Sequence, residues 1–213
     1  MTTHHEYSDK IFKIIHEDLK GLNLTSIDNS KEFYLKQYWD SIFPFLNLPE
    51  MDSLIGEFQN IVDVGFGGGF PLLPLALNFP QKNIYGIESK NKKVQAVKLI
   101  CQKMNISNVK VAHLRLEELS FNRDCLVTFK AVGKIFDYLK IINSEKNIAV
   151  VFFKGRNLRE LEDVPDSVNG LKLVHEADYQ ISPEILRKLV VYKRSVPRGT
   201  NSRNNLVNLS IFD

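Results

Sequence analysis

A group of glycines between two acidic residues is the part of this chain best suited to bind a nucleotide. Asp63 ends a short apolar run, and Gly65, Gly67 and Gly69 follow at alternate positions; a second apolar run ends at Glu88. Glycine lets the backbone turn sharply and brings its N–H groups close to a ligand. An acid at the tip of the next strand, about 20 residues further on, can bind ribose hydroxyls. The spacing predicts a strand, a nucleotide-binding loop, a helix and a second strand.

The glycine spacing favours one nucleotide cofactor over another. A dinucleotide loop needs the spacing G-x-G-x-x-G, whereas this chain has G-x-G-x-G with Phe70 in place of the third glycine. S-adenosylmethionine has no pyrophosphate, so it does not need that spacing. We expect the three glycines and Glu88 to hold S-adenosylmethionine rather than NAD. The alternative is that the glycines form only a flexible turn and that Glu88 lies beside a helix cap.

The pattern that must position this loop is an alternation of strands and helices from residue 60 onward. Strands are predicted at 61–64, 84–87, 109–114, 126–129 and 148–153, with helices at 71–78, 92–104 and 133–142. Such alternation is typical of a parallel sheet covered on both faces. The runs 171–174 and 189–192 are joined by a link too short for a helical crossover, so we expect them to pair antiparallel. The predicted fold is α/β: a Rossmann-like, mostly parallel seven-stranded sheet with a C-terminal antiparallel hairpin, as in class I methyltransferases.

The residues before this pattern predict a helical cap. Apolar residues in 10–20 are spaced as in an amphipathic helix. Ser30 is suited to begin a second helix that runs over 33–43 and ends near Pro44. No break in composition divides the 213 residues, so we expect one domain. It comprises the cap (1–54), the Rossmann-like core (55–196) and a basic polar tail (197–213).

Composition narrows the class of protein. Hydrophobic residues make up 44% and charged residues 25% of the chain, as in ordinary globular proteins. The two cysteines, Cys101 and Cys125, have no close spacing, which favours a reducing, cytoplasmic location. The histidines show no metal-ligand spacing, and no apolar run approaches the roughly 18 residues of a membrane span. No Ser-His-Asp or Cys-His set is visible, which disfavours hydrolases. We expect a monomer with no metal ion.

Basic and aromatic residues favour an RNA partner. Lys36, Lys130, Lys134, Lys154, Arg156 and Arg159 fall in the cap or near predicted strand ends, and Arg187, Lys188, Lys193, Arg194, Arg198 and Arg203 make the C-terminus basic. Open α/β sheets bind ligands at the carboxyl ends of their strands, and RNA phosphates are bound by such side chains. Tyr34, Tyr38 and Trp39 could stack on an unpaired base, although their helical spacing also predicts a place in the core.

Several motifs together resemble one enzyme family. They are Asn23-Leu24-Thr25-Ser26-Ile27, the pair Asp40-Ser41, the glycine loop ending in Pro71 with Pro74-Leu75-Ala76, Leu116-Glu117-Glu118 and Lys154-Gly155. In order and spacing they are similar, over nearly the whole chain, to the bacterial small-subunit ribosomal RNA methyltransferase G family, also called glucose-inhibited division protein B. The resemblance implies a class I methyltransferase fold and S-adenosylmethionine as methyl donor. It also implies that N7 of a guanine is methylated, in 16S rRNA or in the small ribosomal subunit.

The resemblance implies roles for matching positions. Gly65 and Phe70 would contact the cofactor, and Leu116 and Glu117 would flank its adenine. The family has an arginine within an S-R-A motif that reaches cofactor or substrate. In this chain Lys130 stands there, and it keeps the charge but not the planar guanidinium fork.

A second departure from the family pattern lies before the D-S pair. The family has an R-H dipeptide where this chain has Lys36 and Gln37. The N-terminal helical part is also shorter than is usual in the family. These departures leave two alternatives open. One is a divergent methyltransferase acting on another RNA, a small molecule or a protein, and the other is a non-catalytic RNA-binding relative.

The implied reaction needs little from side chains. Guanine N7 has a lone pair and no proton, so its attack on a sulfonium methyl group requires no general base, and alignment supplies most of the catalysis. Asp40 and Lys130 are the candidate catalytic residues, because a nearby carboxylate can ease the movement of charge. Asp40 could instead cap or pair within the cap helix, and Asp63 is expected to brace the glycine loop. Predicted substrate-binding residues are Lys36, Asp40, Lys154 and Arg156.

Overall fold

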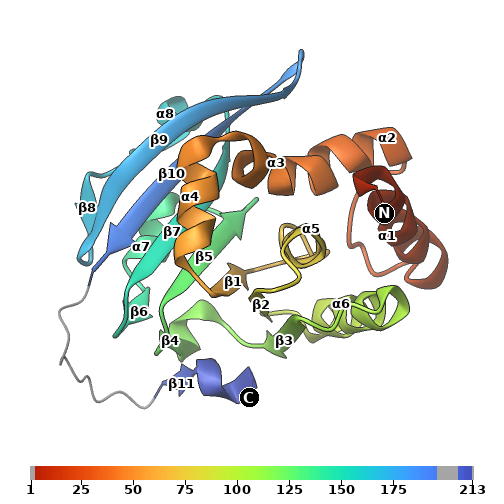
Figure 1. The fold of residues 1–213 in the computed structure, drawn as a ribbon, viewed down its shortest axis with the longest axis horizontal. Coiled ribbons are helices and arrows are strands. Elements are labelled where there is room, and N and C mark those ends of the chain that lie inside the picture. Colours follow the sequence, from red (N-terminus) through yellow and green to blue (C-terminus); the bar gives the residue numbers. More distant parts are fainter. Residues whose placement is uncertain (1–2, 196–205, 213) are drawn as a thin grey trace.

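A mostly parallel sheet of eight strands forms the centre of the computed structural model, which describes residues 3–195 and 206–212 (Figure 1). The strand order is β3-β2-β1-β5-β7-β10-β9-β8. The strands are β1 (Asn60–Val64), β2 (Asn83–Glu88), β3 (Val109–His113), β5 (Cys125–Lys130), β7 (Ile148–Gly155), β8 (Ser167–Val168), β9 (Leu171–Ser182) and β10 (Ile185–Arg194). The strands from β3 to β7 are parallel, and β10 pairs antiparallel with both β7 and β9. The predicted sheet and hairpin are confirmed, and the structure adds the short strand β8.

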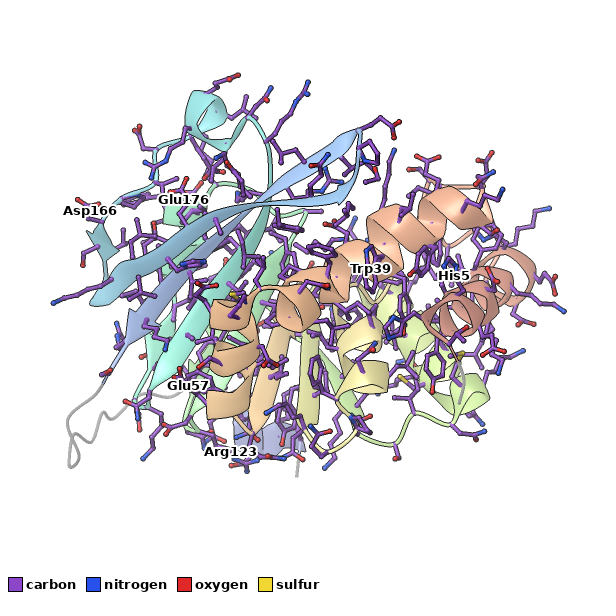
Figure 2. All side chains as sticks on the ribbon, turned by 45° about the horizontal axis from the view of Figure 1, so that its top comes forward. His5, Trp39, Glu57, Arg123, Asp166 and Glu176 are labelled. Atoms are coloured by element: carbon purple, nitrogen blue, oxygen red, sulfur yellow. The ribbon has the colours of Figure 1, made fainter. Side chains whose placement is uncertain are left out.

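The helical cap is built from helices that change into π-helical turns. Its elements are α1 (His4–Lys13), η1 (Ile14–Asp18), α2 (Ser30–Phe33), η2 (Tyr34–Trp39), α3 (Asp40–Asn47) and α4 (Pro49–Glu57). Thr3 begins α1 with a capping box: its hydroxyl accepts a bond from the N–H of Glu6, whose carboxylate accepts one from the N–H of Thr3. Figure 2 shows His5 of α1 and Trp39 of η2 in this cap.

The sequence predicts that the second cap helix ends near Pro44, but in the structure the helix continues past this residue. Pro44 lies inside α3 and removes only one backbone donor from it. The buried side chains of Ile42 and Phe45, on either side of it, hold the helix against the core. Helix α4 was not predicted separately; it begins at Pro49, at a helix position where proline is favoured. The helical part therefore continues past the predicted boundary at residue 54.

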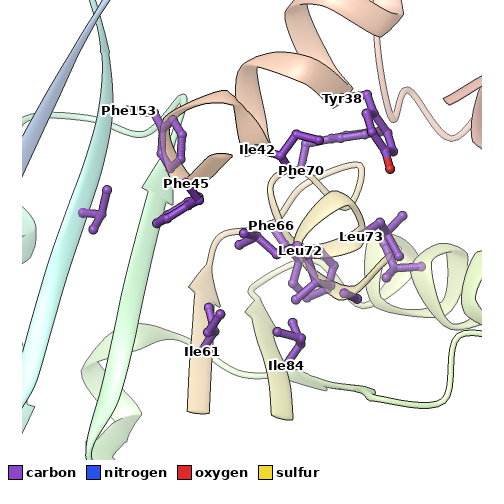
Figure 3. Close-up of a cluster of buried hydrophobic side chains, with 14 of the residues drawn as sticks. Tyr38, Ile42, Phe45, Ile61, Phe66, Phe70, Leu72, Leu73, Ile84 and Phe153 are labelled. Atoms are coloured by element: carbon purple, nitrogen blue, oxygen red, sulfur yellow. The ribbon is translucent and has the colours of Figure 1, made fainter. Parts of the chain in front are cut away.

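Helices cover both faces of the sheet. They are α5 (Leu72–Asn78), α6 (Asn91–Met104), α7 (Ile135–Leu139) and α8 (Leu158–Leu161). Successive strand residues point to opposite faces, so Ile61 packs in the core under the cap, α5 and α6, while Val62 packs in the core under α7 and α8. Figure 3 shows the first core, where Ile61 and Ile84 of neighbouring strands lie near Phe66 and Leu72.

The C-terminal described residues, 206–212, join a small second sheet and pack against the main sheet. β11 (Val207–Asn208) pairs with β4 (Leu119–Phe121), which pairs with β6 (Asn143–Ser144), and η4 (Leu209–Phe212) follows. Leu209 and Phe212 are buried, and the rings of Phe212 and Tyr85 lie 5.0 Å apart. Lys110 Nζ donates to the carbonyl of Phe212 at 2.6 Å. This segment therefore adds apolar surface to the core.

The predicted basic polar tail is described only in part. Residues 206–212 differ from that prediction, because Leu209 and Phe212 are buried in the core. Arg198 and Arg203 lie outside the described residues. In residues 3–195 and 206–212, no helix is both long and apolar enough to cross a membrane.

Candidate functional site

The loop between β1 and α5 takes its shape from three glycines with positive φ. The φ angles of Gly65, Gly67 and Gly69 are 70°, 57° and 97°, a region that residues with a Cβ rarely adopt. The N–H of Gly65 donates to the carbonyl of Ile87 at 2.8 Å, and the N–H of Gly67 donates to Glu88 Oε2 at 3.1 Å. The loop is thus attached to the tip of β2, in the strand–loop–helix–strand order that the sequence predicts.

Asp63 braces this loop from below, as expected. Its carboxylate is buried and accepts bonds from the N–H of Leu72 at 3.1 Å and from Thr128 Oγ1 at 2.9 Å. It therefore joins the start of α5 and strand β5 to β1. Burial raises the pKa of Asp63 from its ordinary value of 3.8 to about 7, although the two hydrogen bonds oppose this shift.

The raised pKa of Asp63 predicts a pH dependence of stability. Between about pH 4 and pH 7 the folded protein keeps a proton on Asp63 that the unfolded chain has lost, so the free energy of unfolding falls as pH rises. Asp63→Asn removes this titration and retains an oxygen for Leu72 and a donor for Thr128. In urea unfolding at pH 4.5 and pH 7.5, the variant should gain stability relative to the native protein by a few kcal/mol between the two pH values, since one pKa unit corresponds to about 1.4 kcal/mol. If the free energy of unfolding changed equally between the two pH values in both proteins, the raised pKa of Asp63 would be contradicted.

A cavity of about 180 Å³ opens beside the glycine loop and Glu88. It is lined by Val64, Gly65, Ile87, Glu88, Ser89, Leu114, Arg115, Leu116, Glu117, Tyr138 and Ile141. Four predicted cofactor contacts, Gly65, Glu88, Leu116 and Glu117, are among them. Tyr138 and Ile141 also line this cavity and were not predicted, although their position after β5 places them at the same edge of the sheet.

The lining of this cavity suits an adenosine group. Leu114, Leu116 and Ile141 provide apolar surface for a purine ring. Glu88 is only 6% exposed, and its Oε1 accepts bonds from the N–H of Lys90 at 2.9 Å and from Ser89 Oγ at 3.2 Å. These bonds fix the carboxylate at the cavity wall, where its remaining lone pairs can accept from two ribose hydroxyls.

The structure does not bring Gly67, Gly69 or Phe70 to the lining of this cavity. Gly67 acts through its bond to Glu88. A Cβ on Gly69 would lie 2.6 Å from Leu73 Cδ1, so this glycine is needed for packing against α5. The ring of Phe70 is buried against Phe33, with their centroids 5.3 Å apart. These three residues therefore shape the loop from behind.

A second cavity, of about 300 Å³, lies between the cap and the carboxyl ends of β5 and β7. Its lining residues are Ile27, Lys36, Gln37, Asp40, Lys130, Ala131, Phe153, Lys154, Gly155 and Arg187. The predicted substrate residues Lys36, Asp40 and Lys154 are brought together here. Lys130 is predicted to contact the cofactor and to act in catalysis, but it lines only this second cavity and not the one beside the glycine loop.

Asp40 is the centre of a buried polar network in the second cavity. Its Oδ1 accepts a bond from the hydroxyl of Tyr179 at 3.0 Å, and its Oδ2 lies 3.4 Å from both Lys130 Nζ and Arg187 Nε. Lys130 Nζ also donates to the carbonyl of Lys36 at 2.9 Å. Burial lowers the pKa of Lys130, and the charge of Asp40 opposes this effect. The network joins the cap to β5 and to the hairpin.

Comparison with known proteins identifies the family. A model of the family described as rRNA small subunit methyltransferase G matches residues 5–181. The chain belongs to this family. Its relatives include ribosomal RNA small subunit methyltransferase G of Lactococcus lactis subsp. cremoris (strain MG1363), 32% identical over 199 residues that cover 89% of this chain and 82% of the relative. That of Streptococcus pyogenes serotype M6 is 30% identical over 186 residues, 83% of this chain and 77% of the relative.

The fold of this chain is also found in a solved methyltransferase structure. Magnesium protoporphyrin IX methyltransferase (ChlM) from Synechocystis PCC 6803, with bound SAM, superposes with a TM-score of 0.52 at 11% identity. The match covers 89% of this chain and 97% of that protein. At this identity the likeness supports the class I methyltransferase fold alone.

Lys154 is a structural clamp in this member of the methyltransferase G family. Its Nζ forms a buried ion pair with Glu162 Oε1 at 2.6 Å and donates to the carbonyl of Gly133 at 2.7 Å. Glu162 Oε2 in turn accepts from the N–H of Ile135 at 2.6 Å. The pair thus holds the segment between β5 and α7. Arg156, the other basic residue predicted to bind substrate near here, is exposed and lines neither cavity.

This clamp predicts that Lys154 supports stability more than RNA binding. Lys154→Met leaves Glu162 buried without its cation, so the free energy of unfolding should fall by about 3 kcal/mol. Lys188→Met is the matched control, because the Asp178 partner of its ion pair is 54% exposed to solvent, so the pair should be worth less than about 1 kcal/mol. Urea denaturation of both variants makes the measurement. Equal stability of the two variants would refute the clamp.

The aromatic residues of η2 pack within the cap. Tyr38 is fully buried, and its hydroxyl accepts a bond from Asn78 Nδ2 at 3.1 Å. Tyr34 stacks on His5 with ring centroids 3.7 Å apart, and Trp39 is half-buried. For Tyr38, the predicted alternative of a place in the core is the correct one.

Metal ligands do not gather at either cavity. Across the described ranges 3–195 and 206–212, no group of three or more His, Cys, Asp or Glu side chains could hold a metal ion. Both cysteines are buried free thiols, and burial raises the pKa of each.

Proposed function

We propose that this chain transfers a methyl group from S-adenosylmethionine to N7 of a guanine in 16S rRNA. The observation that carries the proposal is the pairing of two cavities at one edge of the sheet in a member of the methyltransferase G family. The first cavity lies at the ends of β1 and β2, and the second at the ends of β5 and β7. These four strands are neighbours in the order β2-β1-β5-β7.

The first cavity fits the adenosine part of the cofactor. Glu88 would accept bonds from the ribose hydroxyls, and Leu116 with Leu114 would enclose the adenine. Gly65 would bring its backbone close to the rest of the molecule. When bound, S-adenosylmethionine supplies a methyl group on a positively charged sulfur. The chain's own residues would position the reacting groups.

The second cavity fits a nucleotide of the RNA. Lys36 and Lys154 are each paired with a glutamate. The two cations Lys130 and Arg187 face the single carboxylate of Asp40, which leaves one positive charge in excess. Such a charge attracts an RNA phosphate. Phe153 and Ile27 provide apolar walls suited to a base. Guanine N7 needs no base to remove a proton, so the role left to these residues is alignment.

The proposal is tested by following a labelled methyl group. The purified chain is incubated with tritiated S-adenosylmethionine and with small or large ribosomal subunits from bacteria that lack a methyltransferase G gene. We expect label in the small subunit and none in the large subunit. Free 16S rRNA as a third substrate distinguishes naked RNA from the assembled subunit. Absence of label in every RNA would contradict the proposal. The monomeric state stays a prediction.

A further inference from the structure

Gln37 differs from the other polar residues around the second cavity. Lys36, Lys130 and Arg187 each contact a carboxylate, and Asp40 is held by three groups. Gln37 lines the same cavity and is half-buried, yet no described residue forms a hydrogen bond with its carboxamide. Its two N–H donors and its carbonyl acceptor are therefore available in a cavity whose other polar side chains each contact a charged partner.

The backbone that carries Gln37 is held in place on both sides. Gln37 lies in the π-helical turn η2, a feature frequent at functional sites. Its carbonyl accepts a bond from Ser41 Oγ at 2.5 Å, and the carbonyl of Lys36 accepts one from Lys130 Nζ. These bonds attach η2 to α3 and to β5. The backbone of Gln37 is thus held at the wall of the cavity, and its carboxamide has no partner among the described residues.

We infer that the Gln37 carboxamide holds the target guanine by its Watson–Crick edge, with Oε1 accepting from N1–H and Nε2 donating to O6. This inference rests on the proposed function. N7 must stay free and face the methyl group, so the base has to be held by another edge. N1–H and O6 are an adjacent donor and acceptor, and a carboxamide presents the complementary pair. Lys130 and Arg187 can only donate, and the carboxylate oxygens of Asp40 are already engaged.

The first test compares Gln37→Ala with the native protein on unmodified small subunits. We expect kcat/KM to fall about 10- to 100-fold, the effect of losing one bidentate contact to a base. The dissociation constant for S-adenosylmethionine, measured by calorimetry, should stay within twofold, because Gln37 does not line the cofactor cavity. Gln95→Ala, on the exposed side of α6, is the matched control and should behave as the native protein does. A kcat/KM for Gln37→Ala within twofold of the native value would overturn the inference.

The second test shows which atoms of the base are contacted. The guanine that the native protein methylates is replaced by 2-aminopurine, which lacks N1–H and O6 but keeps N7, in reconstituted small subunits. On this substrate Gln37→Ala and the native protein should have equal kcat/KM. A deficit as large as that on guanine would mean that Gln37 acts elsewhere and would overturn the inference. A native protein that labels no guanine would refute the proposed function itself.

Discussion

Replacement of Glu88 by alanine is expected to raise the dissociation constant for S-adenosylmethionine at least about 30-fold. The carboxylate of Glu88 holds the N–H groups of Gly67 and Lys90 and forms part of the cavity wall. Its loss removes a charged acceptor for the ribose and also frees the glycine loop. Hydrogen bonds to charged groups are worth about 1.5–3 kcal/mol each, and about 2 kcal/mol corresponds to this change. Isothermal titration calorimetry makes the measurement.

Two further variants separate these effects. Glu88→Gln keeps an oxygen for the N–H groups but loses the charge, so we expect an intermediate dissociation constant. Glu117→Ala alters an exposed residue at the mouth of the same cavity and should change affinity less than about threefold. NAD should not bind to the native protein. Native affinity for S-adenosylmethionine in Glu88→Ala would refute the assignment of this cavity to the cofactor.

Asp40→Asn should have the largest effect on activity and also lower stability. Asp40 is only 3% exposed and is the shared partner of Lys130 and Arg187. Without its charge, two cations are left facing each other in a buried site. Removing one partner from a buried ion pair costs about 3–5 kcal/mol. We expect methyl transfer to fall at least about 100-fold, since small displacements of aligned groups have effects of this size. Urea unfolding and methyl transfer to small subunits are the measurements.

A double variant separates the loss of stability from the loss of activity. Asp40→Asn combined with Lys130→Gln removes one anion and one cation, so part of the lost stability should return. Methyl transfer should stay low, because the network that orders the cavity is still absent. The affinity for S-adenosylmethionine should match that of the native protein in both variants. If Asp40→Asn unfolded at the same urea concentration as the native protein, the stabilising role of this network would be contradicted.

The features that could be predicted from the sequence depend on local patterns. The apolar runs and their spacing predicted the strands of the sheet. The glycines between Asp63 and Glu88 predicted the loop, because these residues all lie within one strand–loop–helix–strand unit. The resemblance to the methyltransferase G family depended on short motifs in a fixed order. Each of these inferences needs residues that are near one another in the chain.

The contacts that escaped prediction join distant parts of the chain. Tyr179 and Arg187 reach Asp40 across 139 and 147 positions, and only the register of the hairpin brings them there. Lys154 was predicted to bind substrate because its charge is visible in the sequence, whereas its pairing with Glu162 is not. Phe70 was assigned to the cofactor by resemblance, but its ring packs in the core.

The structure gives a physical meaning to the two departures from the family pattern. Lys130 stands where the family has arginine, and a lysine can contact both Asp40 and the carbonyl of Lys36 with its single ammonium group. Gln37 stands where the family has histidine, and it lines the cavity with a carboxamide that no described residue binds. Both substitutions keep polar groups directed to the same cavity, which favours a retained activity over a non-catalytic relative.

Nucleoside analysis of methylated RNA tests the central claim most directly. Unmodified small subunits are incubated with the chain and S-adenosylmethionine, and the 16S rRNA is digested and analysed by mass spectrometry, with Asp40→Asn as the inactive control. The account predicts close to one N7-methylguanosine per subunit with the native protein and almost none with the variant. A methyl group on any other atom or base, or equal product from the variant, would contradict the account.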